Sequence, residues 1–182
     1  NHKKFVKGSK KNNYYHAEIF QLSRKYFKEA FNKDFDFPME YIYGLIANKW
    51  LFDQFNGKIG LIGAKEKIEL IKSLVEYDEY KKYLGVDDFE DYITVPQKFA
   101  CDNLRKVKND VKKQLESSTA EIFFLGISSL KLGLLHELPK FKKAVYLDVG
   151  VGIDAIAGIV DTNRPYFGDW TNYKIADSSK YE

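Results

Sequence analysis

Four short apolar runs alternate with helical segments through the middle of this 182-residue chain, and this alternation restricts its fold more than any other feature. A run that is apolar throughout predicts a strand buried on both faces, as in parallel sheets covered by helices. The runs are "KIGLIG" (58–63), "DYITVP" (91–96), "EIFFLG" (121–126) and "KAVYLDVG" (143–150).

The segments between these runs carry apolar residues at helical spacing. Helices are predicted over 64–76, 97–117 and 128–138, and the longest has an apolar stripe formed by Phe99, Leu104, Val107, Val111 and Leu115. Strands that alternate with helices indicate parallel strands joined by helical crossovers. We therefore expect an α/β fold: a Rossmann-like, mainly parallel sheet with helices on both faces.

The amino-terminal part predicts a helical lead-in to this sheet. Apolar residues recur at helical spacing over 14–32, Pro38 interrupts the pattern, and a second helix over 39–55 has an end signal at Asn56-Gly57. We expect one α/β domain over 1–182, with a lead-in (1–56), a Rossmann-like core (57–168) and a tail (169–182). The chain begins with Asn1 rather than Met, which is compatible with a fragment of a longer protein and with an upstream domain of the same chain.

Charge and composition limit the classes of molecule that the chain is expected to bind and the compartment in which it is expected to occur. The 29 Lys and Arg residues nearly balance 26 Asp and Glu residues, and the two signs are interspersed, so we expect no nucleic-acid partner. No apolar run approaches the roughly 20 residues that span a bilayer, so we expect no membrane span. Cys101 is the single cysteine, which favours a reducing compartment and a cytoplasmic location.

The third run is followed by "GISS", which we name the serine turn (126–129). Ligands of open parallel sheets bind beyond the carboxyl ends of the strands. Gly126 allows the backbone to approach a ligand, and the hydroxyls of Ser128 and Ser129 suit the phosphates of a diphosphate. Capping of the next helix explains the two serines equally well.

The fourth run ends in "DVGVG", which we name the aspartate turn (148–152). Asp148 can accept hydrogen bonds from ribose or sugar hydroxyls or hold a metal; alternatively it caps the turn. Gly150 and Gly152 suit either a phosphate or close packing of strand and helix. We expect the serine and aspartate turns to lie side by side and to form a notch that binds an anion.

The sequence "LDVGVG" also resembles the glycine-rich motif of S-adenosylmethionine-dependent methyltransferases. In those enzymes the motif follows the first strand, whereas here about 30 residues remain after it. A methyltransferase would therefore need a permuted fold, and it stays an alternative on those terms.

Four short motifs follow one another in order within residues 57–168. They are Val95-Pro96 with Ala100, Phe124–Gly126, Tyr146–Gly150 and Asp154–Gly158, followed by "TNRP" at 162–165. This collinear set resembles the GT-D-type glycosyltransferase domains of bacteria and viruses, which have a strand ending in a proline turn, a strand with a glycine-containing loop, a strand ending in an Asp-x-Gly motif, and an Asp-x-x-x-Gly segment.

The resemblance implies transfer of a sugar from a nucleotide-sugar donor to a glycan or glycoprotein acceptor. The donor diphosphate would lie over the serine and aspartate turns, with Arg164 as a bidentate phosphate contact. Asp148 and Asp154 are the candidate catalytic residues, as a base or to orient the acceptor hydroxyl, and Asp169 is a further candidate substrate contact.

The chain departs from the family in one motif. The family usually carries an Asp-x-Glu metal motif after its first strand, and residues 1–56 show none. A divalent metal, Mn²⁺ or Mg²⁺, is compatible with the chemistry, but the sequence assigns it no ligands. The catalytic half lies upstream, or the motif has changed, or the domain is a non-catalytic binding or scaffold module of a polysaccharide-synthesis protein.

Overall fold

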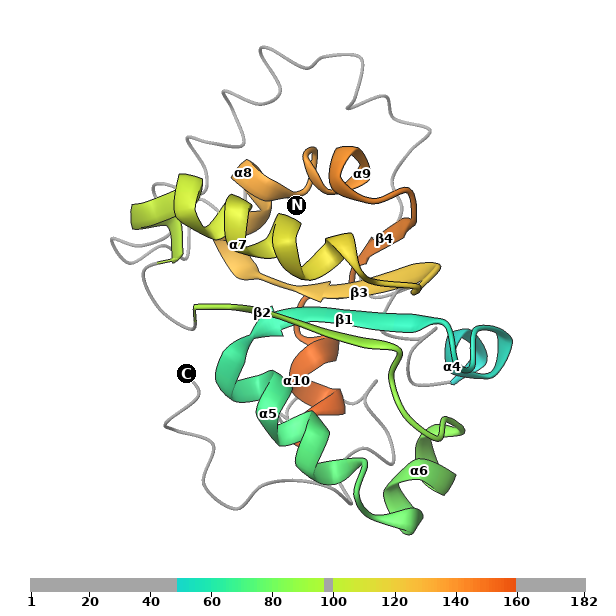
Figure 1. The fold of residues 1–182 in the computed structure, drawn as a ribbon. Coiled ribbons are helices and arrows are strands. Elements are labelled where there is room, and N and C mark those ends of the chain that lie inside the picture. The colour runs from blue at the N-terminus through green and yellow to red at the C-terminus, as the bar shows by residue number, and fades with distance from the viewer. Residues whose placement is uncertain (1–48, 97–99, 160–182) are drawn as a thin grey trace, which may run out of the picture. The chain divides into compact units, whose positions relative to one another are not determined.

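Four parallel strands form one sheet in the order β2-β1-β3-β4. The computed structural model describes residues 49–96 and 100–159, all within one compact unit of the chain (Figure 1). The predicted helix over 14–32, most of the one over 39–55, and the candidate residues Arg164 and Asp169 lie outside the described residues. The strands are β1 (Ile59–Ala64), β2 (Asp91–Val95), β3 (Ile122–Gly126) and β4 (Val145–Asp148).

The central strand β1 explains why the apolar runs are continuous. All six of its residues are buried, because helices cover both faces of the sheet and β2 and β3 pair with its two edges. All three strand pairs are parallel, with Gly63 opposite Gly126 in the β1–β3 pair. The predicted Rossmann-like parallel α/β fold is confirmed.

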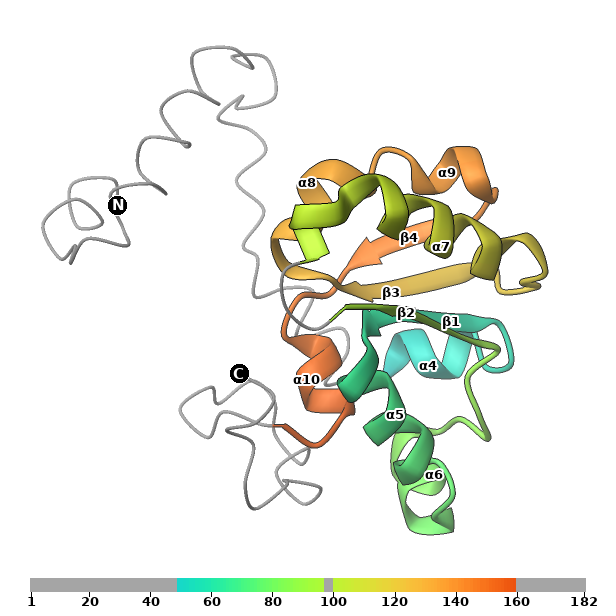
Figure 2. The same ribbon diagram turned by 60° about the vertical axis from the view of Figure 1, so that its left-hand side comes forward.

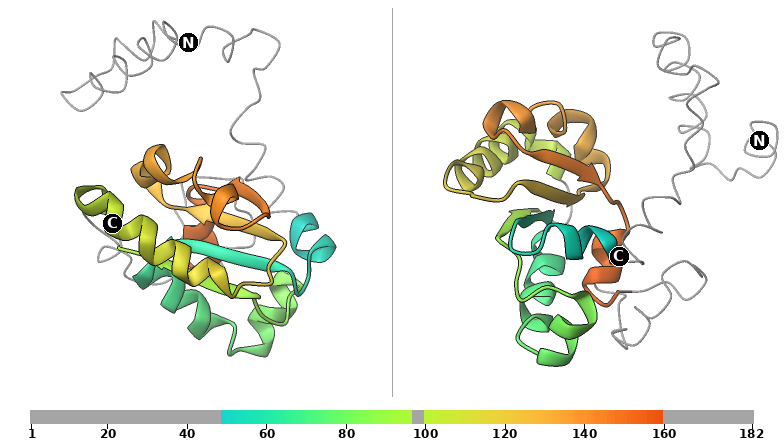
Figure 3. Two further views of the ribbon diagram at one scale, coloured as in Figure 1. Left: turned by 45° about the horizontal axis from the view of Figure 1, so that its top comes forward. Right: turned by 90° about the vertical axis from the view of Figure 1, so that its right-hand side faces the viewer.

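The helices divide between the two faces of the sheet, as the ribbon views show (Figures 1, 2 and 3). One face packs against α4 (Trp50–Gln54), α5 (Lys65–Leu74), α6 (Asp78–Leu84) and α10 (Gly152–Ile156). The other face packs against α7 (Leu104–Glu116), the 3₁₀ turn η4 (Ser128–Leu130), α8 (Lys131–Leu134) and α9 (Leu138–Phe141). A further 3₁₀ turn, η3 (Ala100–Asn103), leads into α7.

Two neighbouring phenylalanines of β3 anchor the two faces. Successive strand residues point to opposite faces, so Phe123 and Phe124 enter different cores. Phe124 meets Phe52 edge-on, with ring centroids 5.6 Å apart, and Phe123 stacks on Tyr146 at 5.3 Å. Such pairs add about 0.5–1.5 kcal/mol each beyond the burial of their area.

Three helical segments differ from the sequence prediction. The helix expected over 97–117 is α-helical only from Leu104, after the 3₁₀ turn η3, and its first residues, 97–99 with Phe99, lie outside the described residues. The expected single helix over 128–138 is three short pieces, η4, α8 and α9. Pro139 lies in the first turn of α9, and a helix continuing through it would place its ring against the carbonyl of Leu135. The structure also contains α6, which the sequence analysis did not predict.

The unpredicted helix α6 is held mainly by tertiary contacts. It is rich in charged residues, and its buried side chains are Tyr80 and Leu84, one turn apart. The hydroxyl of Tyr80 donates a hydrogen bond to the carbonyl of Ile156 in α10. Among the described helices, none is both long and apolar enough to cross a membrane.

Candidate functional site

The carboxyl ends of the strands, here named the carboxyl edge, contain the topological switch of the sheet. From β1 the chain crosses to β2 on one side and then to β3 on the other side. Crossovers that diverge from two adjacent strands leave a crevice between their carboxyl ends, where parallel α/β sheets bind ligands. The residues at this switch are Gly63 of β1 and Gly126 of β3.

The serine turn and the aspartate turn lie side by side at this edge. β3 and β4 are paired, with Leu125 opposite Asp148. The pairing continues into the aspartate turn, since the carbonyl of Leu125 accepts hydrogen bonds from the amides of Val149 and Gly150 at 2.9 and 3.1 Å. The expected placement of the two turns next to each other is therefore what the structure shows.

The space beside Gly126 is filled by protein. A Cβ atom at this position would lie 2.6 Å from Cβ and Cγ1 of Ile153 and 3.0 Å from the carbonyl oxygen of Gly150. Ile153 is fully buried, and Gly152 before it is also buried. The absence of a side chain at Gly126 thus permits packing of α10 against β3. Ile153 fills the expected notch at this point, so the expected approach of a ligand to the backbone of Gly126 is not what the structure shows. A ligand at this edge would lie over the exposed serines.

Both serines of the serine turn are exposed, and Ser128 has an unusual backbone conformation. Its φ is +46°, a left-handed conformation that non-glycine residues seldom adopt. Neither η4 nor α8 has a side-chain capping hydrogen bond in the described structure, so helix capping does not account for the two serines. Strained residues of this kind concentrate at functional sites.

Asp148 is held by both of its carboxylate oxygens. Oδ1 accepts a hydrogen bond from the amide of Gly150 at 3.2 Å, and Oδ2 lies 2.6 Å from Nζ of Lys131. The backbone of Gly150 has φ +51°, which a glycine adopts without strain. Asp148 therefore shapes its own turn, as the alternative explanation proposed, and also forms an ion pair at the carboxyl edge.

Asp154 forms a second ion pair at the same edge. Its Oδ1 lies 2.5 Å from Nζ of Lys67, so the pair joins α10 to α5. Both side chains are largely buried, with exposed fractions of 24% and 17%. This environment suits a contact between helices, and the catalytic role of Asp154 stays a prediction.

The two lysines of these pairs were not among the candidates from the sequence. A lysine follows each of two strand ends closely: Lys67 lies three residues after β1, and Lys131 lies five residues after β3. Lysine is abundant throughout the chain, so the position of a lysine after a strand does not by itself indicate a site residue; the ion pairs do. The structure adds both cations to the carboxyl edge.

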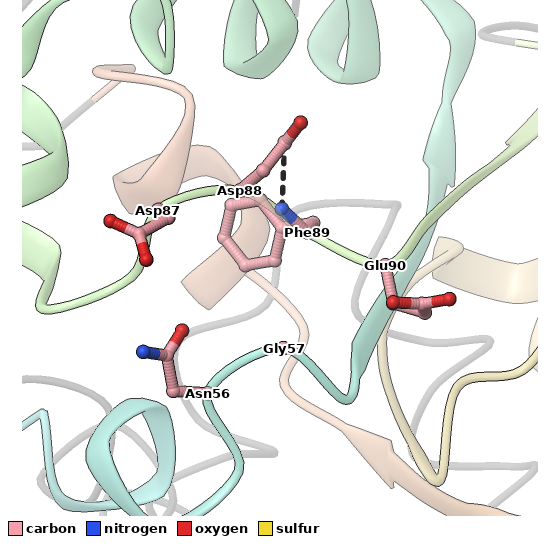
Figure 4. A pocket seen from close by; sticks show the side chains of 6 residues that line it. All are labelled: Asn56, Gly57, Asp87, Asp88, Phe89 and Glu90. Carbon is pink, nitrogen blue, oxygen red and sulfur yellow. Dashed lines mark hydrogen bonds between the residues drawn. The ribbon is translucent and has the colours of Figure 1, made fainter.

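A shallow depression of about 250 Å³ lies at the opposite edge of the sheet, before β1 and β2 (Figure 4). Its lining residues are Asn56, Gly57, Asp87, Asp88, Phe89 and Glu90. Asp88 accepts hydrogen bonds from the amide of Phe89, at 2.7 Å, and from the hydroxyl of Tyr92. Burial, and then this bond to Asp88, raise the pKa of Tyr92 well above its usual range. The position of Asp88 is thus explained by the local turn.

Metal ligands are not assigned by the geometry. Among residues 49–96 and 100–159, no three His, Cys, Asp or Glu side chains are grouped so that they could hold a metal ion.

Comparisons of the chain with protein-family models, with curated proteins and with solved structures found no match.

Proposed function

We propose that this α/β domain binds a nucleotide sugar at its carboxyl edge and transfers the sugar to a glycan or glycoprotein acceptor. The observation that carries the proposal is the adjacency of the serine turn and the aspartate turn beside the β1–β3 switch. This is where parallel α/β sheets bind nucleotides. The collinear motifs shared with GT-D-type domains support the choice of a sugar nucleotide.

The groups at this edge match the parts of a nucleotide sugar. The hydroxyls of Ser128 and Ser129 are exposed and suited to donate hydrogen bonds to phosphate oxygens. Asp148 is half-buried, one of its oxygens is fixed by a backbone amide, and a carboxylate so placed can accept a proton. The predicted phosphate contact Arg164 and the predicted substrate contact Asp169 remain part of the proposal.

In the proposed transfer, the oxygen of an acceptor hydroxyl forms a bond to the anomeric carbon while the bond from that carbon to the diphosphate breaks. The bonding electrons leave with the nucleoside diphosphate, and Asp148 takes the proton of the acceptor hydroxyl. A positioned base of this kind contributes about 10²–10⁴-fold to the rate.

The cellular compartment and the partners of the protein are also part of the proposal. The described thiol of Cys101 is free and exposed, which fits a reducing compartment. We place the protein in the cytoplasm, with a nucleotide sugar and a glycan or glycoprotein acceptor as its partners and no nucleic acid.

A titration series followed by a turnover assay tests the proposal. UDP-, GDP-, dTDP- and CMP-sugars are titrated calorimetrically into the chain, and hydrolysis of each donor is then measured with Mn²⁺, with Mg²⁺ and with chelator. We expect one of the three diphosphate-linked classes to bind and to be hydrolysed, and the CMP-sugars, which carry a single phosphate, to be left unchanged. Asp148→Asn should lower turnover about 100-fold or more while donor binding persists.

The matched control is Glu121→Gln, which alters an exposed ion-paired carboxylate at the opposite edge of the sheet. Its turnover should equal that of the wild type. Donor binding without turnover under every condition would favour the non-catalytic module, and binding of S-adenosylmethionine instead of any sugar nucleotide would favour the permuted methyltransferase.

A further inference from the structure

The ion pair between Lys131 and Asp148 is open to exchange with an incoming anion. The side chain of Lys131 is 42% exposed, against 17% for Lys67 in the other pair, whereas the two carboxylates are similarly exposed, at 30% for Asp148 and 24% for Asp154. The ammonium of Lys131 is therefore reached by solvent, which screens its attraction to the carboxylate. A phosphate group arriving at the carboxyl edge can therefore replace the carboxylate as the partner of Lys131 at low cost.

The carboxylate would keep its orientation after such an exchange. The two oxygens of Asp148 have different partners: Oδ1 is bound by the amide of Gly150, and Oδ2 by Lys131. Departure of the lysine removes only the second partner. The backbone contact then still fixes the side chain, and Oδ2 becomes available to another donor such as a hydroxyl.

The ammonium of Lys131 is attached to the same turn as the two exposed serines. The backbone amide of Lys131 donates to the carbonyls of Ser128 and Ser129, so the start of α8 is fixed to the serine turn. One short segment therefore carries a cation and two hydroxyls, which are all donors. Phosphate oxygens are acceptors and prefer charged donors such as lysine.

From these contacts we propose that Lys131 is a diphosphate-binding residue that exchanges partners when the donor binds. In the ligand-free chain it neutralises Asp148; with donor bound it contacts the diphosphate and thereby frees Oδ2 of Asp148 to receive the acceptor hydroxyl. The identity of the donor in this inference rests on the proposed function. The exchange makes binding ordered, with the donor before the acceptor.

Inorganic pyrophosphate is the probe that tests the exchange, because it has the diphosphate but neither base nor sugar. Calorimetric titration should show affinity about 10-fold weaker for Lys131→Met than for the wild type. Lys131→Arg, which keeps the charge, should restore the affinity to within about 3-fold. Asp148→Asn should bind pyrophosphate up to about 5-fold more tightly, because the competing carboxylate charge is gone.

The matched control is Lys58→Met. Lys58 forms an exposed ion pair with Glu121 at the opposite edge of the sheet, 2.8 Å apart against 2.6 Å for Lys131 and Asp148. Its removal should leave pyrophosphate affinity unchanged. Circular dichroism and thermal unfolding of each variant establish that the fold is intact before affinities are compared.

Three results would overturn the inference: no binding of pyrophosphate by the wild type, equal binding by Lys131→Met, or weakening by Asp148→Asn as large as that by Lys131→Met. Sugar transfer by Lys131→Met with unchanged KM for the donor would also refute it, while the proposed function would stand. Binding of pyrophosphate that depends on Lys131, with no transfer from any sugar nucleotide, would instead refute the proposed function and retain the diphosphate contact.

Discussion

Gly126→Ala is the substitution for which the structure predicts the clearest cost. The new Cβ atom would lie 2.6 Å from Cβ and Cγ1 of Ile153 and 3.0 Å from the carbonyl oxygen of Gly150. Neither group can move aside easily, because Ile153 is fully buried and the carbonyl of Gly150 belongs to the backbone. Overpacking of this kind costs about 1–3 kcal/mol, and we expect the upper end of that range.

A smaller opposing effect comes from the unfolded chain. Replacing Gly by Ala restricts the unfolded ensemble and stabilises the fold by about 0.4–1 kcal/mol. The net loss expected for Gly126→Ala is therefore about 2 kcal/mol in the free energy of unfolding. Urea denaturation followed by far-ultraviolet circular dichroism measures it, with the slope of the transition expected to stay constant.

Gly63→Ala is the matched control, since Gly63 lies opposite Gly126 in the neighbouring strand. A Cβ atom at Gly63 would meet the terminal methyl of Ile68 at 3.2 Å and a methyl of Ile153 at 3.4 Å. Methyl groups at the ends of side chains can move by a few tenths of an ångström, so we expect a change within about 1 kcal/mol of zero. Equal stability of Gly126→Ala and the wild type, or a larger loss for Gly63→Ala, would refute this account of how α10 packs.

Three other predictions concern stability. Gln114→Ala should lower the free energy of unfolding by about 1–2 kcal/mol in urea denaturation. The side-chain amide of Gln114 accepts a hydrogen bond from the N–H of Thr94 at 2.9 Å and donates one to the carbonyl of Thr94 at 3.2 Å, on the outer edge of β2. A loss no larger than that caused by replacing an exposed lysine of α7 with Ala would contradict this prediction. Lys67→Met should cost about 0.5–1.5 kcal/mol in the same assay, since it removes the 2.5 Å ion pair that joins α10 to α5. Wild-type stability of this variant would show that the pair contributes nothing. Burial raises the pKa of Tyr146 to about 12, so the unfolded chain loses the phenol proton at lower pH than the folded chain. The wild type should therefore lose stability between pH 10 and pH 12 more steeply than Tyr146→Phe. Parallel curves of stability against pH for the two proteins would contradict this prediction.

The strands and the fold class were predictable because burial on both faces leaves a direct trace in the sequence. The run "EIFFLG" needs apolar residues at every position, since Phe123 and Phe124 enter opposite cores. Helix α6 left no such trace, because only Tyr80 and Leu84 of its seven residues are buried and a contact with α10 holds it. The break before α9 had a local signal in Pro139, but the apolar spacing before this proline predicted one continuous helix over 128–138.

The candidate site was predictable in its location and less so in its contacts. Parallel strands carry their carboxyl ends to one edge, so Ser128 and Asp148 could be placed together from the order of the elements alone. The filling of the space at Gly126 by Ile153 depends on the docking angle of α10, which no local pattern encodes. The pairing of Lys131 with Asp148 joins residues 17 positions apart, and the many lysines in the chain offered no reason to select that one.

The central claim is that a nucleotide sugar binds over the serine and aspartate turns. The most direct measurement is a titration of the ¹⁵N-labelled chain with the donor class selected by calorimetry, followed by amide NMR chemical shifts. We predict that the shifts concentrate at residues 126–131 and 148–152 and leave residues 56–57 and 87–90 at the opposite edge unchanged. Shifts confined to the opposite edge, or none at saturating donor, would contradict the account.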